Sequence, residues 1–223
     1  DILLKPKLEW ILPRSRPQKQ CATDEEWRKI VLGCAELGVF RLLAPSQLLY
    51  VDGIPVRHNC LGVGKGKYLE NGLEKQRMVF NLDITNSMLR LITADFRSLS
   101  YPVQWQAVQM LDPQEENESE LVFAFSSTDL TCAYFCFGLE RSWNKYLAFE
   151  GSVTGADVSH IYPELRDEPT LYACSAVLPM GFNSASSIMQ FIHVKMATMD
   201  RPRGAGLSIY RRMRVDRPVA HDG

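Results

Sequence analysis

Hydrophobic residues recur at helical spacing after Thr23, and this pattern predicts the first helix of the chain. Thr23 and Glu26 have the spacing of a capping box, in which each side chain binds the backbone N–H of the other residue. Gly38 is suited to end the helix, because glycine adopts the left-handed conformation at little cost. The apolar positions of this helix are Trp27, Ile30, Val31, Cys34 and Leu37.

Short apolar runs later in the chain predict strands rather than helices. Asp52-Gly53 lies between two such runs and favours a β-hairpin within 47–63, since this pair tolerates the positive φ angles of a tight turn. Further strands are predicted over 77–82, 121–126, 146–149 and 172–178.

Glycines and lysines alternate over 62–67, in a segment that superficially resembles a phosphate-binding loop. The spacing of Gly62, Gly64 and Gly66 fits neither of the two glycine-rich phosphate motifs. We therefore predict a flexible basic loop that carries Lys65 and Lys67.

The remaining segments complete the expected architecture. Three prolines among basic residues predict an extended arm over 1–20, and five acids in nine residues predict a solvated loop over 112–120. Asn183 or Ser184 can cap a last helix, whose apolar positions run from Ala185 to Met196. Together these elements predict an α+β fold, with antiparallel strands and helices packed on one side.

Composition narrows the possible classes of protein. With 46% hydrophobic and 23% charged residues in 223, the chain can form a sizeable core, which excludes a disordered protein. A net charge of −1 excludes a global positive field for nucleic acid or acidic membranes, so any such binding must use a local patch. No apolar run approaches the length of a membrane span, so no membrane association is expected.

The six cysteines include no C-x-x-C pair. They predict reduced thiols packed as small hydrophobic side chains in an intracellular protein, in the nucleus or the cytoplasm. None of the four histidines has zinc-ligand spacing with two cysteines, so no structural zinc site is expected.

Asp129 is the first candidate for chemistry, because it follows the apolar run 121–126 and precedes two aromatic residues. A carboxylate buried there needs a metal ion, a cation or water as its partner. When only the neighbouring residues are considered, they favour the alternative, an aspartate that caps a turn.

Three segments of the chain, at 76–86, 129–149 and 177–190, resemble motifs of reverse transcriptases, the RNA-directed DNA polymerases of retroelements. They follow one another in the same order as in that family. Gln76–Asn86 is similar to their fingers motif and Val177–Gln190 to their second palm motif. Asp129–Phe135, followed by Arg141 and Lys145–Phe149, is similar to their first palm motif. The resemblance covers roughly residues 65–196.

The resemblance implies a polymerase that uses two Mg²⁺ ions for nucleotidyl transfer. Asp129 matches the catalytic, metal-binding carboxylate, and the backbone carbonyl of Leu130 would be a further oxygen ligand. The implied partners are an RNA or DNA template with its primer and a deoxynucleoside triphosphate.

The resemblance also assigns nucleotide-binding residues. Arg77 matches the arginine that contacts the triphosphate, and Tyr134 matches the aromatic residue under the incoming sugar. Pro179, Met180 and Gly181 would form the turn beside template and nucleotide, with glycine allowing close backbone approach, and Gln190 would lie on the helix that follows. Each position also has an ordinary structural interpretation: a solvated arginine, a core aromatic residue, and a helix face that packs in the core. No fingers lysine is assigned.

The domain organisation implied is an extended arm (1–22), a fingers-like region (23–120), a palm-like region (121–200) and a basic tail (201–223). The aromatic-x-Asp-Asp motif that supplies the other metal carboxylates does not occur after Gln190, and Asp83 and Ser186 depart from common family residues. We therefore expect a piece of a longer product, with an incomplete palm and no thumb, inactive on its own. The alternatives are a non-catalytic descendant that binds nucleic acid or protein, and an unrelated α/β domain.

Overall fold

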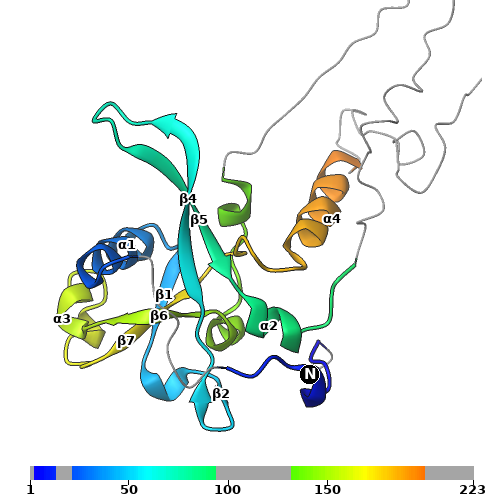
Figure 1. Cartoon of the computed structure of the whole chain (residues 1–223), viewed down its shortest axis with the longest axis horizontal. Helices are drawn as coiled ribbons and strands as arrows, with labels where there is room; N and C mark the ends of the chain where they lie inside the picture. The colour runs from blue at the N-terminus through cyan, green and yellow to red at the C-terminus, as the bar shows by residue number, and fades with distance from the viewer. Residues whose placement is uncertain (1–2, 14–21, 94–131, 199–223) are drawn as a thin grey trace, which may run out of the picture. The chain divides into compact units, whose positions relative to one another are not determined.

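A computed structural model of the chain describes residues 3–13, 22–93 and 132–198 (Figure 1). The chain divides into two compact units. The described part of the first unit comprises 3–13, 22–91 and 132–185, and the described part of the second comprises 92–93 and most of the last helix.

A three-stranded antiparallel sheet lies at the centre of the first unit. Its strand order is β1 (Phe40–Leu43), β7 (Leu171–Ser175), β6 (Ala148–Val153), so that the last of these strands in the chain is the central one. The helices and antiparallel sheets of the structure confirm the predicted α+β class.

Helix α1 (Asp24–Glu36) begins and ends where the sequence predicts. The Thr23 hydroxyl accepts a hydrogen bond from the Glu26 N–H at 3.3 Å, and the Glu26 carboxylate accepts one from the Thr23 N–H at 2.8 Å. The hydrogen bonds from Thr23 lower the pKa of the Glu26 carboxyl. Trp27, Val31 and Ala35 form the buried face of the helix.

Thr23→Ala is expected to lower the free energy of unfolding by about 1 kcal/mol, because it leaves N-terminal N–H groups of α1 without their side-chain acceptor. Chemical denaturation of the variant beside the wild type measures the loss. Thr23→Ser keeps the hydroxyl and should retain most of the stability, so equal losses in the two variants would contradict a capping role.

The predicted hairpin around Asp52-Gly53 is confirmed as β2 (Tyr50–Val51) and β3 (Ile54–Pro55). Asp52 and Gly53 have φ angles of 51° and 78°, the left-handed conformation that this turn requires.

The prediction of a flexible basic loop over 62–67 is wrong, since these residues belong to β4 (Asn59–Tyr68). This strand pairs along its length with β5 (Glu74–Asn81), with an irregularity between Gly64 and Tyr68, and the hairpin projects from the sheet (Figure 1). The glycines are compatible with a strand here because Gln76 and Glu74 of β5 fill the space beside Gly62 and Gly64. The strand predicted over 77–82 is confirmed within β5.

Other boundaries differ from the predictions by a few residues. The predicted arm contains a short 3₁₀-helix η1 (Lys7–Glu9) and pairs with the rest of the unit through a Leu4–Leu89 bridge. The strand predicted over 146–149 begins only at Ala148, after the 3₁₀-helix η6 (Arg141–Tyr146), and the strand predicted over 172–178 lies at 171–175. The other elements are η2 (Pro45–Gln47), α2 (Asp83–Met88), η5 (Ala133–Cys136), α3 (Gly155–Val158) and η7 (Pro163–Leu165).

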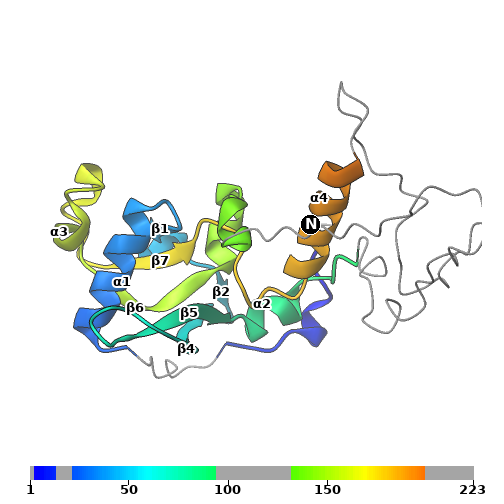
Figure 2. The same ribbon diagram turned by 90° about the horizontal axis from the view of Figure 1, so that it is seen from above.

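Four aromatic rings from α1, β1, β5 and β6 form the centre of the core. The rings of Phe80 and Phe149 stack at 4.8 Å between centroids, Phe40 lies 5.1 Å from Phe149, and Trp27 meets Phe149 edge to face. All four side chains are at most 2% exposed. The contact between Phe80 and Phe149 joins the hairpin to the sheet. Figure 2 shows the hairpin strands β4 and β5 beside β6 of the sheet.

The last helix, α4 (Ala185–Thr198), begins where the sequence predicts, directly after Ser184. Met196, which was expected on its packed face, is 52% exposed. None of the helices in the described ranges combines the length and hydropathy needed to cross a lipid bilayer. The predictions over 112–120, 121–126 and 201–223 lie outside the described residues.

Candidate nucleotide-binding site

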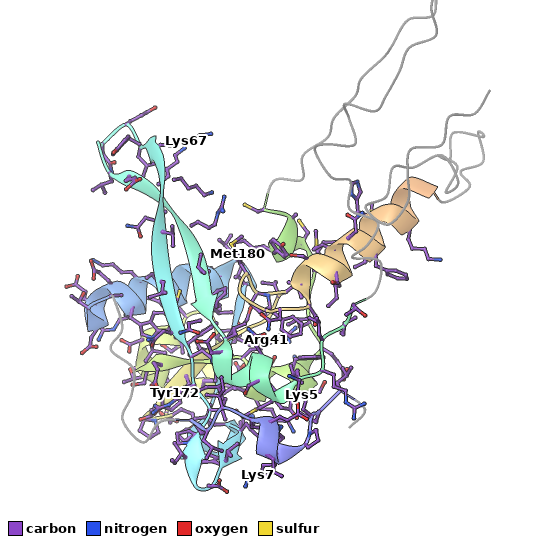
Figure 3. All side chains as sticks on the ribbon, turned by 45° about the vertical axis from the view of Figure 1, so that its right-hand side comes forward. Lys5, Lys7, Arg41, Lys67, Tyr172 and Met180 are labelled. Carbon is purple, nitrogen blue, oxygen red and sulfur yellow. The ribbon has the colours of Figure 1, made fainter. Side chains whose placement is uncertain are left out.

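The turn at Pro179–Gly181 packs directly on strand β5. The Phe80 N–H donates a hydrogen bond to the Met180 carbonyl at 3.0 Å. Gly181 has a φ of 117°, and a Cβ at this position would overlap the carbonyl oxygen of Phe80. The close backbone approach expected of Gly181 therefore occurs within the chain, against the strand that also carries Arg77. Figure 3 shows Met180 beside this strand.

Asn86 of α2 fixes the same turn from its other side. Its side-chain amide donates to the Gly181 carbonyl at 2.8 Å, and its Oδ1 accepts from the Asn183 N–H at 3.0 Å. One side chain thus binds the backbone on both sides of Phe182, which is itself buried. The turn is held by three hydrogen bonds to the segment 80–86.

Tyr134 lies on η5, and the residues that follow η5 bond to the segment between β7 and the turn. The Phe137 carbonyl accepts a hydrogen bond from the Leu178 N–H at 2.8 Å, and Gly138 forms an antiparallel bridge with Val177. The side chain of Tyr134 is half-buried. The backbone therefore joins those parts of the three resembling segments that lie in the first unit, namely 76–86, 132–149 and 177–185.

His58 lies buried between α2 and η6, close to these contacts. Its Nε2 is 2.9 Å from the Thr85 hydroxyl and 3.0 Å from the Tyr146 carbonyl, and the Thr85 hydroxyl donates to the same carbonyl. Burial lowers the pKa of His58 from 6.5 to about 4, so the imidazole is neutral at physiological pH. This group anchors α2, and with it Asn86, to the sheet.

Positive charge accumulates on the β4–β5 hairpin. The segment 59–81 has four basic and two acidic side chains, and all four basic ones are exposed. Arg77 lies opposite Val63 in the strand pair, and Lys67 is at the far end of the hairpin (Figure 3). The basic residues are Lys65, Lys67, Lys75 and Arg77.

A cavity of about 200 Å³ lies beside the Asn86 contacts. Two basic residues, Lys5 and Arg90, line it together with Asn86, Asn183 and Ser184. The two cationic side chains at this small cavity suit an anionic group such as a phosphate, and Leu89, Leu91 and Phe182 complete its lining.

The structure brings together only part of the predicted site. Arg77, Tyr134 and the turn 179–181 belong to the first unit, whereas Gln190 is half-buried in α4 and belongs to the second. Asp129 and Leu130, which carry the catalytic and metal predictions, lie outside the described residues. Within 3–13, 22–93 and 132–198, no three His, Cys, Asp or Glu side chains cluster as metal ligands.

The prediction that the cysteines pack as small hydrophobic side chains is wrong at two positions. Cys132 and Cys136 are exposed, because the short η5 turn has no buried residue and presents both its ends to solvent. Cys34 and Cys60 are half-buried, and Cys174 is buried as expected.

Asn86 and His58 were not singled out from the sequence. Asn86 ends the predicted fingers motif, but its partners are 95 and 97 residues away in the chain. A polar residue whose function depends on such distant contacts has no local signal in a single sequence.

Models of known protein families give no match to the sequence, and neither do the curated proteins to which it was compared.

Proposed function

We propose that the chain carries the nucleotide-binding part of a retroelement reverse transcriptase, an RNA-directed DNA polymerase that uses Mg²⁺. The observation that carries this proposal is the contact of three motif-like segments around the turn 179–181. The turn bonds to Phe80 and Asn86, and the segment after Tyr134 bonds to residues 176–178, which lead into the turn.

The finer architecture proposed is a fingers-like region that includes the β4–β5 hairpin and a palm-like region that includes β6 and β7. The exposed Arg77 would bind the triphosphate of the incoming nucleotide, because its planar guanidinium suits phosphate oxygens. Lys5 and Arg90 beside their small cavity would bind a template phosphate. Asp129 and the carbonyl of Leu130 would hold the Mg²⁺ ions. Tyr134 would lie under the sugar of the incoming nucleotide, and Gln190 would be a further nucleotide-binding residue.

Arg77→Ala is expected to weaken binding of a complementary deoxynucleoside triphosphate about tenfold, since one charge-assisted contact to phosphate is lost. The measurement is nucleotide titration, in Mg²⁺, of the protein bound to a fluorescent RNA-template, DNA-primer duplex, followed by anisotropy.

Arg166→Ala is the matched control, because it removes the same charge from an exposed position after η7. It should bind nucleotide as the wild type does. Equal binding of complementary and mismatched nucleotides, or equal losses in the two variants, would contradict the proposal.

A non-catalytic binding module is the second candidate, favoured by the exposed basic hairpin. The same titration distinguishes a non-catalytic binding module from a polymerase site. A binding module would hold the duplex with an affinity that no nucleotide changes, whereas a polymerase site would hold it more tightly when the complementary nucleotide is present.

A further inference from the structure

Two exposed thiols lie on one short turn of the first unit. Cys132 precedes η5 and Cys136 ends it, and these are the two exposed cysteines of the described ranges. The remaining described cysteines, Cys34, Cys60 and Cys174, are half-buried or buried.

The backbone directs Cys136 back towards Cys132. Cys132 has a φ of 54° and a ψ of 36°, a left-handed conformation that costs a non-glycine residue about 1 kcal/mol. In this conformation its carbonyl accepts the Phe135 N–H at 2.8 Å and lies 3.8 Å from Cys136 Sγ. The Cys136 thiol therefore lies over the backbone of the residue that carries the other thiol.

The environment separates this pair from the other thiols. Burial raises the pKa of Cys34 to about 11 and that of Cys174 to about 12, which keeps both protonated and slow to react near neutral pH. Cys132 and Cys136 are exposed, so small oxidants can reach both thiols from solvent.

We propose that Cys132 and Cys136 form a reversible dithiol–disulfide pair. One thiolate attacks a low-molecular-weight disulfide, such as glutathione disulfide, and releases one small thiol as a mixed disulfide forms. The second cysteine then attacks the protein sulfur of that mixed disulfide and releases the other small thiol. Two electrons and two protons pass from the cysteine pair to the small disulfide.

Formation of the bond would cross-link both ends of η5, the turn that carries Tyr134 and Phe135. The dithiol–disulfide pair requires only the two thiols and is independent of the proposed polymerase function. If that function holds, the cross-link would act on the residue expected under the incoming sugar.

The test exposes the full chain to glutathione buffers of increasing oxidised fraction, then quenches with acid, alkylates the free thiols and maps peptides by mass spectrometry. We expect the peptide with both cysteines to lose its two alkyl labels together and to have a mass about 2 Da below that of the dithiol form. In Cys136→Ser, Cys132 should stop at the mixed disulfide with glutathione, and Cys132→Ser should give the reciprocal result.

Cys60→Ser is the control, because it removes a half-buried thiol and should leave the coupled loss unchanged. The proposal is overturned if wild-type protein accumulates glutathione adducts without the internal bond, if either cysteine pairs with another thiol instead, or if both labels persist in fully oxidised buffer.

Discussion

Replacing Gly181 by alanine is expected to lower the free energy of unfolding by about 3 kcal/mol. Gly181 has a φ of 117°, a conformation that residues with a Cβ rarely adopt. The added methyl group would also overlap the Phe80 carbonyl, a backbone atom that has no rotamer to change. Relief would require the turn to move away from β5, which would stretch the hydrogen bond between Phe80 and Met180.

Gly53→Ala, measured in a denaturant titration, separates the cost of backbone strain from the cost of the overlap with Phe80. Gly53 also has a positive φ, 78°, but nothing lies within 4 Å of a Cβ built on it. Its substitution should cost about 1 kcal/mol, from backbone strain alone. If the two variants lost the same stability, the contact with Phe80 would contribute nothing and the turn would not be held as described.

The turn also connects stability to the proposed function. Arg77 is three residues before Phe80 on the same strand, so a shift of the turn relative to β5 changes the position of the backbone beside the arginine. Under the proposed function, Gly181→Ala should weaken nucleotide binding as well as folding.

Local chemistry explains which elements could be predicted from the sequence. The capping box at Thr23 and the Asp52-Gly53 turn depend on residues within a few positions of one another, and both predictions are confirmed. The segment 62–67 has no such local determinant, because its glycines are poor strand formers and its pairing is supplied by β5. The structure of this segment therefore depends on its pairing with β5.

The candidate site shows the same division. The resemblance to the second palm motif singled out Gly181 for close backbone approach to template and nucleotide, but nothing in the sequence indicates that Gly181 lies against the Phe80 carbonyl. The partners of His58 are 27 and 88 residues away and those of Asn86 are 95 and 97 residues away, and single-sequence patterns do not encode such contacts. The exposure of Cys132 and Cys136 likewise follows from the shape of η5.

The free energy of unfolding is expected to fall by about 2 kcal/mol between pH 7.5 and pH 5, because His58 must remain neutral in the folded state. Its pKa is about 4 when folded, against 6.5 as the ordinary value. Between these values the unfolded chain binds a proton that the folded chain does not, so protonation favours unfolding. This contribution is fully present above pH 6.5 and is lost as the pH falls towards 4.

Denaturant titrations at several pH values measure this loss, and His58→Gln should flatten the profile over the same range. Glutamine cannot titrate, but its side-chain amide can still donate to the Tyr146 carbonyl that His58 now contacts at 3.0 Å. His160→Gln is the matched control, since it makes the same substitution at an exposed histidine and leaves the buried His58 in place. A profile that keeps its slope in His58→Gln would assign the pH dependence to groups other than His58.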